Sequence, residues 1–247
     1  MPSHHRGSEL SRRRFLAGSV AGAGALAGTS LVGAGQAAAA TQYSLTVVND
    51  SDESWDFFLF QEYVGVGPAG LKPLAWLTKY VAAHNTGNFS WNLGYSFVWA
   101  PTGPLAVGGT FTAGQRVAAD PFSPTQNQIR LGTDAQSGWP KFFHGTATPN
   151  PQQGSLYVRQ LASVPADTVS IGIGQSGSPV FAVQAQPGKT TQFTPRNGPY
   201  VVAAGVSVGA GDVLAPDEIV EQAVIPFDGT FAMQATFNED HTWTVTD

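Results

Sequence analysis

The most informative absence in this 247-residue sequence is cysteine, of which there is none. Without cysteine the chain has no disulfides, no thiolate metal ligands and no catalytic thiol. Small exported domains use disulfides when their core is too small to fold without them. A chain of about 200 residues buries roughly 70% of its unfolded surface and needs no such bridges. We therefore expect a fold that depends on its hydrophobic core alone.

Charge is also scarce, since charged residues make up 12% of the chain and acidic residues outnumber basic ones by 17 to 12. Four arginines and one glutamate fall in the first forty residues, which leaves eight basic and sixteen acidic residues, a net charge of −8. Nucleic acids and anionic lipid surfaces attract clusters of Lys and Arg. The negative balance argues against both as partners.

The first forty residues have the pattern of a bacterial twin-arginine export signal. The consensus positions are Arg12, Arg13, Phe15 and Leu16. A weakly apolar Gly/Ala run follows, and "AGQAAAA" offers small residues for cleavage before Thr41. A membrane anchor is the alternative, but a run made mostly of Gly and Ala is a poor membrane span. We expect export of a folded protein that comprises residues 41–247.

The rest of the chain predicts an all-β fold. Its apolar segments are short or alternate with polar residues, and Gly, Pro, Asn or Asp bound them. The predicted strands cover residues 41–48, 55–61, 74–81, 87–92, 95–99, 109–118, 128–132, 154–160, 168–174, 180–186, 190–194, 200–206, 221–226, 229–238 and 241–246. This pattern is typical of an antiparallel β-sandwich of roughly a dozen short strands, with little or no helix.

The segment "GTATPNPQQG", residues 145–154, is a possible internal seam within one domain, since its prolines keep the chain extended. The order of strands and turns before it resembles the order after it. Two pseudo-repeats folded as facing sheets would explain this rhythm. The alternative is that the two halves look alike only because strands and turns of any all-β chain have a similar composition.

The segment "GIGQSG", residues 172–177, matches the G-x-G-x-x-G dinucleotide fingerprint. Dinucleotide binding requires a helix after the glycines, whose N-terminus holds the pyrophosphate. Here the apolar strand pattern "SPVFAV" follows instead, and no acidic residue lies at the ribose position. These glycines predict a tight hairpin turn.

The acidic turn "NDSDESWD" offers Asp50, Asp52 and Asp56 as candidate Ca²⁺ ligands, although the EF-hand spacing fails. A solvated turn with Asx-type bonds is the alternative. The histidines after residue 40 lack the short spacing of a zinc site. They are His84, His144 and His241. We expect no cofactor.

The sequence contains no G-x-S-x-G or H-E-x-x-H motif. A glycosidase needs only two carboxylates beside a cleft. Asp120 and Asp134, which lie near the aromatic segments, are the candidates for such a pair.

Aromatic residues are the strongest remaining signal for a binding site. Exposed Trp and Tyr rings stack on sugars, while neighbouring polar side chains bond hydroxyls. The candidate residues are Trp55, Trp139, Tyr95 and Trp99. Trp139, in a turn-rich segment, and Trp55 are expected to be exposed. The alternative is that these rings belong to the core.

Several segments of the chain carry a family resemblance. They are "YSLTVVNDS" (43–51), "WDFFLFQ" (55–61), "LAWL" (74–77), "YSFVW" (95–99), "GSLYV" (154–158), "VSIGIGQSG" with "FAVQAQPG" (169–188) and "TWTVT" (242–246). In these segments, which occur in matching order, the chain resembles the RhiA family of small all-β proteins of soil bacteria. The resemblance implies a β fold and a soil or root-associated setting. It implies no catalytic activity, because none of these segments is a catalytic motif.

We expect an exported, non-catalytic binding or interaction protein whose ligand is a glycan. One alternative is a structural protein of the cell surface that self-associates through strand edges. A second alternative is a polysaccharide hydrolase with a carboxylate pair.

Overall fold

The computed structural model describes residues 41–214, 219 and 221–247. Within it, Ala39–Asp247 forms one compact unit. The export-signal positions Arg12, Arg13, Phe15 and Leu16 lie outside the described residues.

The fold is all-β, as the sequence predicts. Seventeen strands and no helix occur among the described residues. That part of the chain accordingly contains no helix long and apolar enough to span a membrane. The first strand shows why alternation matters, since Tyr43, Leu45 and Val47 are buried while the residues between them are half-buried.

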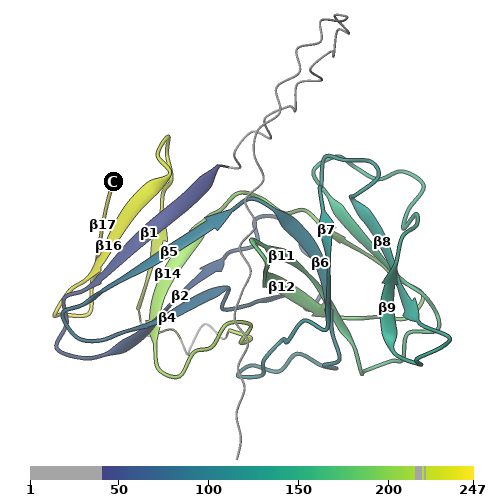
Figure 1. Ribbon diagram of the computed structural model, residues 1–247, viewed down its shortest axis with the longest axis horizontal. Coiled ribbons are helices and arrows are strands. Elements are labelled where there is room, and N and C mark those ends of the chain that lie inside the picture. Colours follow the sequence, from purple (N-terminus) through teal and green to yellow (C-terminus); the bar gives the residue numbers. More distant parts are fainter. Residues whose placement is uncertain (1–40, 215–218, 220) are drawn as a thin grey trace, which may run out of the picture. The chain divides into compact units, whose positions relative to one another are not determined.

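The first sandwich consists of two four-stranded sheets. One sheet has the order β17-β16-β1-β5, and the other has the order β15-β14-β2-β4. Their strands are β1 (Gln42–Asn49), β2 (Trp55–Gln61), β4 (Leu77–Val81), β5 (Thr86–Asn92), β14 (Tyr200–Gly205), β15 (Glu221–Ile225), β16 (Ala232–Phe237) and β17 (Trp243–Thr246). Figure 1 shows these strands at the side of the fold that carries the C-terminus.

The second sandwich consists of a four-stranded sheet, β13-β10-β8-β9, and a five-stranded sheet, β3-β12-β11-β6-β7. Their strands are β3 (Lys72–Pro73), β6 (Tyr95–Ala100), β7 (Gln115–Ala119), β8 (Gln128–Thr133), β9 (Pro140–Phe143), β10 (Leu156–Gln160), β11 (Ser170–Gln175), β12 (Ser178–Gln184) and β13 (Thr190–Phe193). Strands β6 to β9, β11 and β12 are labelled on the other side of Figure 1.

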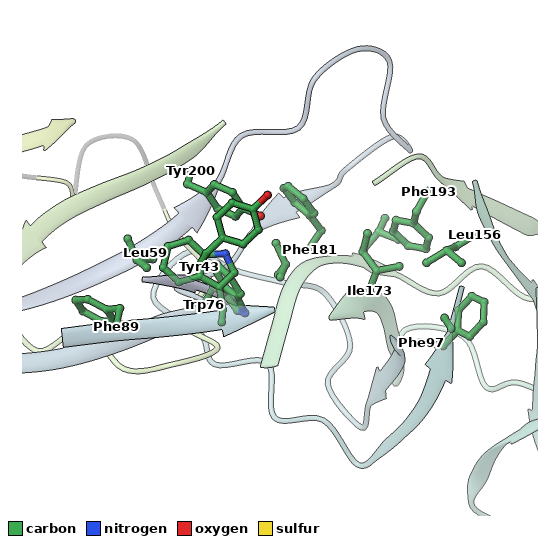
Figure 2. Close-up of a cluster of buried hydrophobic side chains, with 14 of the residues drawn as sticks. Tyr43, Leu59, Trp76, Phe89, Phe97, Leu156, Ile173, Phe181, Phe193 and Tyr200 are labelled. Carbon is green, nitrogen blue, oxygen red and sulfur yellow. The ribbon is translucent and has the colours of Figure 1, made fainter. Parts of the chain in front are cut away.

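Aromatic rings join the two sheets within each sandwich. Phe57 on β2 meets Phe237 on β16 with ring centroids 5.6 Å apart. In the second sandwich, Phe97 on β6 faces Phe142 on β9 at 6.4 Å. Both pairs belong to one large hydrophobic core that continues through both sandwiches, and Figure 2 shows ten labelled members of it.

Two of the sheets are mixed rather than purely antiparallel. Strand β1 pairs with β16 in parallel, and β10 pairs with β8 in parallel. The remaining strand pairs are antiparallel among the described strands. The predicted β-sandwich class is therefore correct. The structure has more strands than the roughly a dozen predicted, and its two parallel strand pairs were not predicted.

The two sandwiches exchange strands between the halves of the chain. The first sandwich combines β1, β2, β4 and β5 with the last four strands, β14 to β17. The second combines β10 to β13 with β6 to β9, plus the short β3. The strands of the two halves therefore correspond in chain order once the short β3 is left out. Strands β1, β2, β4 and β5 correspond to β10 to β13, and β6 to β9 correspond to β14 to β17. The change from one half to the other falls between β9 and β10, at the segment that the sequence suggests as a seam.

Hydrogen bonds repeat between corresponding strands. The Asn49 amide donates to the Asn85 carbonyl at 2.9 Å, and the Gln160 amide donates to the Lys189 carbonyl at 2.8 Å. Both Asn49 and Gln160 are fully buried polar residues at the ends of β1 and β10. Equivalent residues therefore make equivalent bonds in the two sandwiches.

Two glutamines at corresponding positions contact each other. The Gln61 side chain donates to the Gln175 side chain, and both residues are buried. Gln61 on β2 lies opposite Tyr200 on β14, while Gln175 on β11 lies opposite Tyr95 on β6. Tyr95 in the second sandwich is thus the counterpart of Tyr200 in the first.

The glycine motif forms the β11–β12 hairpin, as predicted. Ser176 and Gly177 both have positive φ, 49° and 82°, in its two-residue turn. A Cβ on Gly172 would lie 2.1 Å from the Phe181 carbonyl oxygen on the neighbouring strand. The glycines therefore serve chain reversal and close strand packing.

Some strand boundaries differ from the predictions. In the segment predicted as strand 109–118, the strand begins only at Gln115. Thr110, nearer the start of that segment, makes an isolated bridge to Asp212 instead. The two-residue β3 and the four-residue β9 were not predicted, because each begins or ends at a proline and neither is long enough to show alternation.

Candidate functional site

Two of the four predicted aromatic platforms belong to the core. Trp55 is 7% exposed, and its indole N–H donates to the Ser51 hydroxyl at 3.1 Å. Trp99 is 6% exposed, and its N–H donates to the Gln115 side chain at 3.0 Å. The expectation that Trp55 is exposed is wrong, because strand alternation turns its ring inward against Phe237.

Trp139 is exposed, as predicted, with 64% of its surface accessible. It lies at the end of the β8–β9 turn, where its carbonyl accepts the Asp134 amide at 2.9 Å. The Asp134 carboxylate in turn accepts the Ser137 hydroxyl at 2.8 Å. These bonds hold Trp139 on a compact turn with its ring toward solvent.

The acidic turn does not assemble the predicted metal ligands. Asp52 pairs with His84 at 3.0 Å, with both side chains exposed. The turn is organised instead by Asn49, whose side chain donates to the carbonyls of Glu53, Val81 and Ala82. No group of three His, Asp or Glu side chains suited to a metal occurs in the described part of the chain. Asp50 and Asp52 are therefore exposed residues of a solvated turn, the alternative reading, whereas Asp56 is half-buried on strand β2.

The remaining histidines that the sequence analysis named do not assemble a zinc site among these described residues either. His241 stacks on Phe237 with ring centroids 5.4 Å apart and interplanar angle 9°. His144 is exposed just after β9.

The two candidate catalytic carboxylates have different surroundings. Hydrogen bonding by Ser137 lowers the pKa of Asp134, which keeps this carboxylate ionised and disfavours a role as a proton donor. Asp120 lies after β7, where its carboxylate accepts the Phe122 amide at 2.9 Å. Asp120 lines a pocket, whereas Asp134 is not among the residues that line it.

This pocket is the largest of the described cavities, with a volume of about 980 Å³. Four connections and the ends of β6 and β7 form it. The β5–β6 turn contributes Leu93 and Gly94, the end of β7 and the chain after it contribute residues 119–122, and the β13–β14 loop contributes residues 195–199. Tyr95, at the start of β6, and Val64 complete the wall.

The pocket has an apolar interior and a partly polar rim. Ala119 and Pro121 are buried, while Leu93, Tyr95 and Pro195 are half-buried. The rim residues are exposed and include a carboxylate, a guanidinium, an amide and a phenyl ring. They are Asp120, Arg196, Asn197 and Phe122.

Tyr95 is the polar group of the interior. Burial raises the pKa of Tyr95 to about 12, and the phenols of Tyr200 and Tyr43 add to the effect. At neutral pH its hydroxyl is therefore firmly protonated and can both donate and accept a hydrogen bond.

A hydrogen-bond chain fixes one wall of the pocket. The Asn197 amide donates to the Tyr43 hydroxyl at 2.7 Å, and its oxygen accepts the Tyr200 hydroxyl. The Gln175 side chain donates to Tyr200 at 3.2 Å. Asn197 is thus tied to the core through two tyrosines, so the β13–β14 loop presents Arg196 from a fixed backbone.

Two smaller pockets differ in character. One, of about 410 Å³, is lined mainly by Gln and Thr side chains around β12 and β13. Another, of about 340 Å³, lies beside Phe58 and Val208. No aromatic residue lines the first of these pockets among the described residues, and the ring of Phe58 in the second is fully buried, so the pocket around Tyr95 is the candidate site.

The profile of the RhiA family matches residues 40–247 of the chain. The chain belongs to the RhiA family. It is 32% identical to Protein RhiA of Rhizobium leguminosarum bv. viciae over 217 residues, which cover 86% of this chain and 90% of that protein. No solved structure matches it.

Membership in the RhiA family confirms the resemblance seen in the sequence and covers every strand of both sandwiches. It assigns no ligand, so the function rests on the pocket. Sequence reasoning named Tyr95 and Asp120 for separate roles but missed Phe122, Arg196 and Asn197. The only local signal was proline in "DPFSP" and "TPRNGP", which predicts ordered loops without saying that they meet.

Proposed function

We propose that this RhiA-family chain is an exported, non-catalytic binding protein that holds a carbohydrate ligand in the pocket around Tyr95. The observation that carries the proposal is the rim, where the 68% exposed ring of Phe122 stands beside Asp120. Sugar rings stack on such aromatic faces while carboxylate, amide and guanidinium groups bond their hydroxyls.

Three features support binding rather than catalysis. Among the described residues, one carboxylate lines the pocket, that of Asp120, whereas a glycosidase uses two. The β13–β14 loop is tied to the core through Asn197, Tyr43 and Tyr200, which preforms this wall of the pocket. The size of the pocket falls within the range of small-ligand sites.

Titration calorimetry with cello-, xylo- and galacto-oligosaccharides tests the proposal. We expect binding of at least one series, and we expect Phe122→Ala to weaken it about three- to ten-fold, because an aromatic contact contributes roughly 0.5–1.5 kcal/mol. Trp139→Ala is the matched control, since it removes an exposed ring that does not line the pocket.

Other outcomes would point elsewhere. Loss of binding in Trp139→Ala alone would place the site on the β8–β9 turn. Concentration-dependent assembly that ignores sugars would favour the structural alternative. Release of reducing ends that stops in Asp120→Asn would favour a hydrolase.

A further inference from the structure

The two sandwiches differ at the place where the first is filled with aromatic rings. Around Tyr200, the ring centroids of Trp91 and Phe227 lie at 5.1 Å and 5.8 Å, and that of Tyr43 lies at 5.9 Å. Trp76 stacks on the same ring at 5.9 Å. We call Tyr43, Trp91 and Phe227 the aromatic plug; Figure 2 shows Tyr43 and Trp76 gathered at Tyr200.

The strand register identifies the counterpart of Phe227. Tyr200 pairs with Ile225, and Phe227 follows two residues later. Its counterpart Tyr95 pairs with Ala119, and two residues later stands Pro121.

The other two plug residues have counterparts defined in the same way. Leu45 pairs with Phe89 in the first sandwich, and Leu156 pairs with Phe193 in the second. Two residues before each leucine stand Tyr43 and Gly154, respectively. Two residues after each phenylalanine stand Trp91 and Pro195, respectively.

All three plug rings are therefore replaced around Tyr95 by residues without an aromatic ring. Pro121 and Pro195 line the pocket, and the Gly154 amide donates to the Pro121 carbonyl at 2.9 Å. Protein interiors are close-packed, and a site that loses its aromatic partners without compensating side chains keeps a void. The pocket occupies the position that the plug fills in the first sandwich.

We propose that the interior of the pocket holds an aromatic ring of the ligand, which packs on Tyr95 in place of the plug. Taken with the carbohydrate rim, on which this inference rests, the ligand class is an aryl glycoside. The aryl group lies among Tyr95, Pro121 and Pro195, and the sugar lies at the rim on Phe122, beside Asp120 and Arg196.

The division between interior and rim supports this orientation. The interior offers apolar surface and one protonated phenol, which suits an aryl ring with few polar substituents. The exposed carboxylate and guanidinium remain solvated at the rim, where a sugar can bond them without a buried, unpaired charge. The reverse orientation would place sugar hydroxyls against prolines, where they would lack partners.

Calorimetry with phenyl β-D-glucopyranoside, methyl β-D-glucopyranoside and phenol tests the inference on the protein comprising residues 41–247. We expect the phenyl glucoside to bind at least roughly ten-fold more tightly than the methyl glucoside, and more tightly than phenol. Pro195→Trp restores a plug ring and should abolish the preference for phenyl. Pro149→Trp, at an exposed position outside the pocket, is the matched control.

Saturation-transfer NMR on the unaltered protein gives a second readout that does not depend on folding of Pro195→Trp. We expect the strongest saturation on the phenyl protons of the phenyl glucoside. Saturation confined to the glucose protons would overturn the inference.

The outcomes separate this inference from the proposed function. Equal affinity for phenyl and methyl glucosides, unchanged in Pro195→Trp, would overturn the aryl inference and leave carbohydrate binding in place. Phenol binding as tightly as the phenyl glucoside would support the ring position and contradict the carbohydrate rim. No binding of any probe at millimolar concentration would contradict both.

Discussion

At the scale of single residues, the most consequential group is Tyr95. It is the counterpart of Tyr200, yet residues without an aromatic ring replace the three plug residues around it, and Tyr95 lines the pocket. Burial raises the pKa of Tyr95 to about 12, so the folded state favours the neutral phenol over the phenolate.

This shift predicts a loss of stability at alkaline pH. Because the folded-state pKa lies above the ordinary value of 10.0, the folded protein binds more protons than the unfolded chain between about pH 10 and 12. The stabilisation is complete below pH 10 and is lost as pH rises through 12, by up to roughly 2–3 kcal/mol. Urea unfolding at about pH 9 and about pH 11.5 measures it, and Tyr95→Phe should flatten the dependence. An unchanged slope in that variant would contradict the assignment.

The buried glutamine pair gives a second prediction at this scale. Replacing Gln175 with Leu leaves the Gln61 amide without its acceptor and Tyr200 without its donor. We expect a loss of about 1–3 kcal/mol in the free energy of unfolding. Gln61→Leu combined with Gln175→Leu should cost less than the sum of the two single changes, since both partners are then apolar. Strict additivity in denaturant unfolding would show that the two side chains do not interact.

At the scale of elements, the β11–β12 hairpin shows where sequence reasoning succeeds. Its turn needs positive φ at Ser176 and Gly177, and its strands need a glycine at position 172, so glycine and strand pattern together predict it. The short β3 and β9 carry no such pattern. The two parallel pairs could not be predicted either, because strand partners far apart in the chain leave no local signal.

The hairpin also gives a stability test. Gly172→Ala would place a methyl group 2.1 Å from a backbone oxygen of β12, which must separate the strands. We expect a loss of about 3 kcal/mol or more in the free energy of unfolding. Gly177→Ala meets no atom within 4 Å and has only its φ of +82° to strain it, so about 1–2 kcal/mol is expected. Equal effects in chemical denaturation would contradict the close approach.

The candidate site illustrates the limit of local reasoning. Tyr95 and Asp120 stood out in the sequence because of their residue type. Their neighbours Arg196 and Asn197 come from the other half of the chain, and only strand exchange brings them to the same pocket. No spacing in the sequence encodes that meeting.

At the scale of the whole molecule, strand exchange makes the two halves mutually dependent. The central strands β1 and β2 each pair with a strand of the second half, and so do β6 and β8. Each half alone would leave these edges and a large apolar face open to water.

We therefore expect fragments 41–149 and 150–247 to be unfolded when separate and to assemble into a folded complex when mixed. Circular dichroism and amide exchange would measure this. Cooperative folding of either fragment alone would contradict an obligatory exchange of strands.

The central claim is that the pocket around Tyr95 is the ligand site of this RhiA-family protein. Amide chemical-shift mapping during titration with phenyl β-D-glucopyranoside tests it most directly. The account predicts that the shifted amides cluster in residues 93–95, 119–122 and 195–199. Shifts that cluster instead on the β8–β9 turn around Trp139, with none in these three segments, would contradict it.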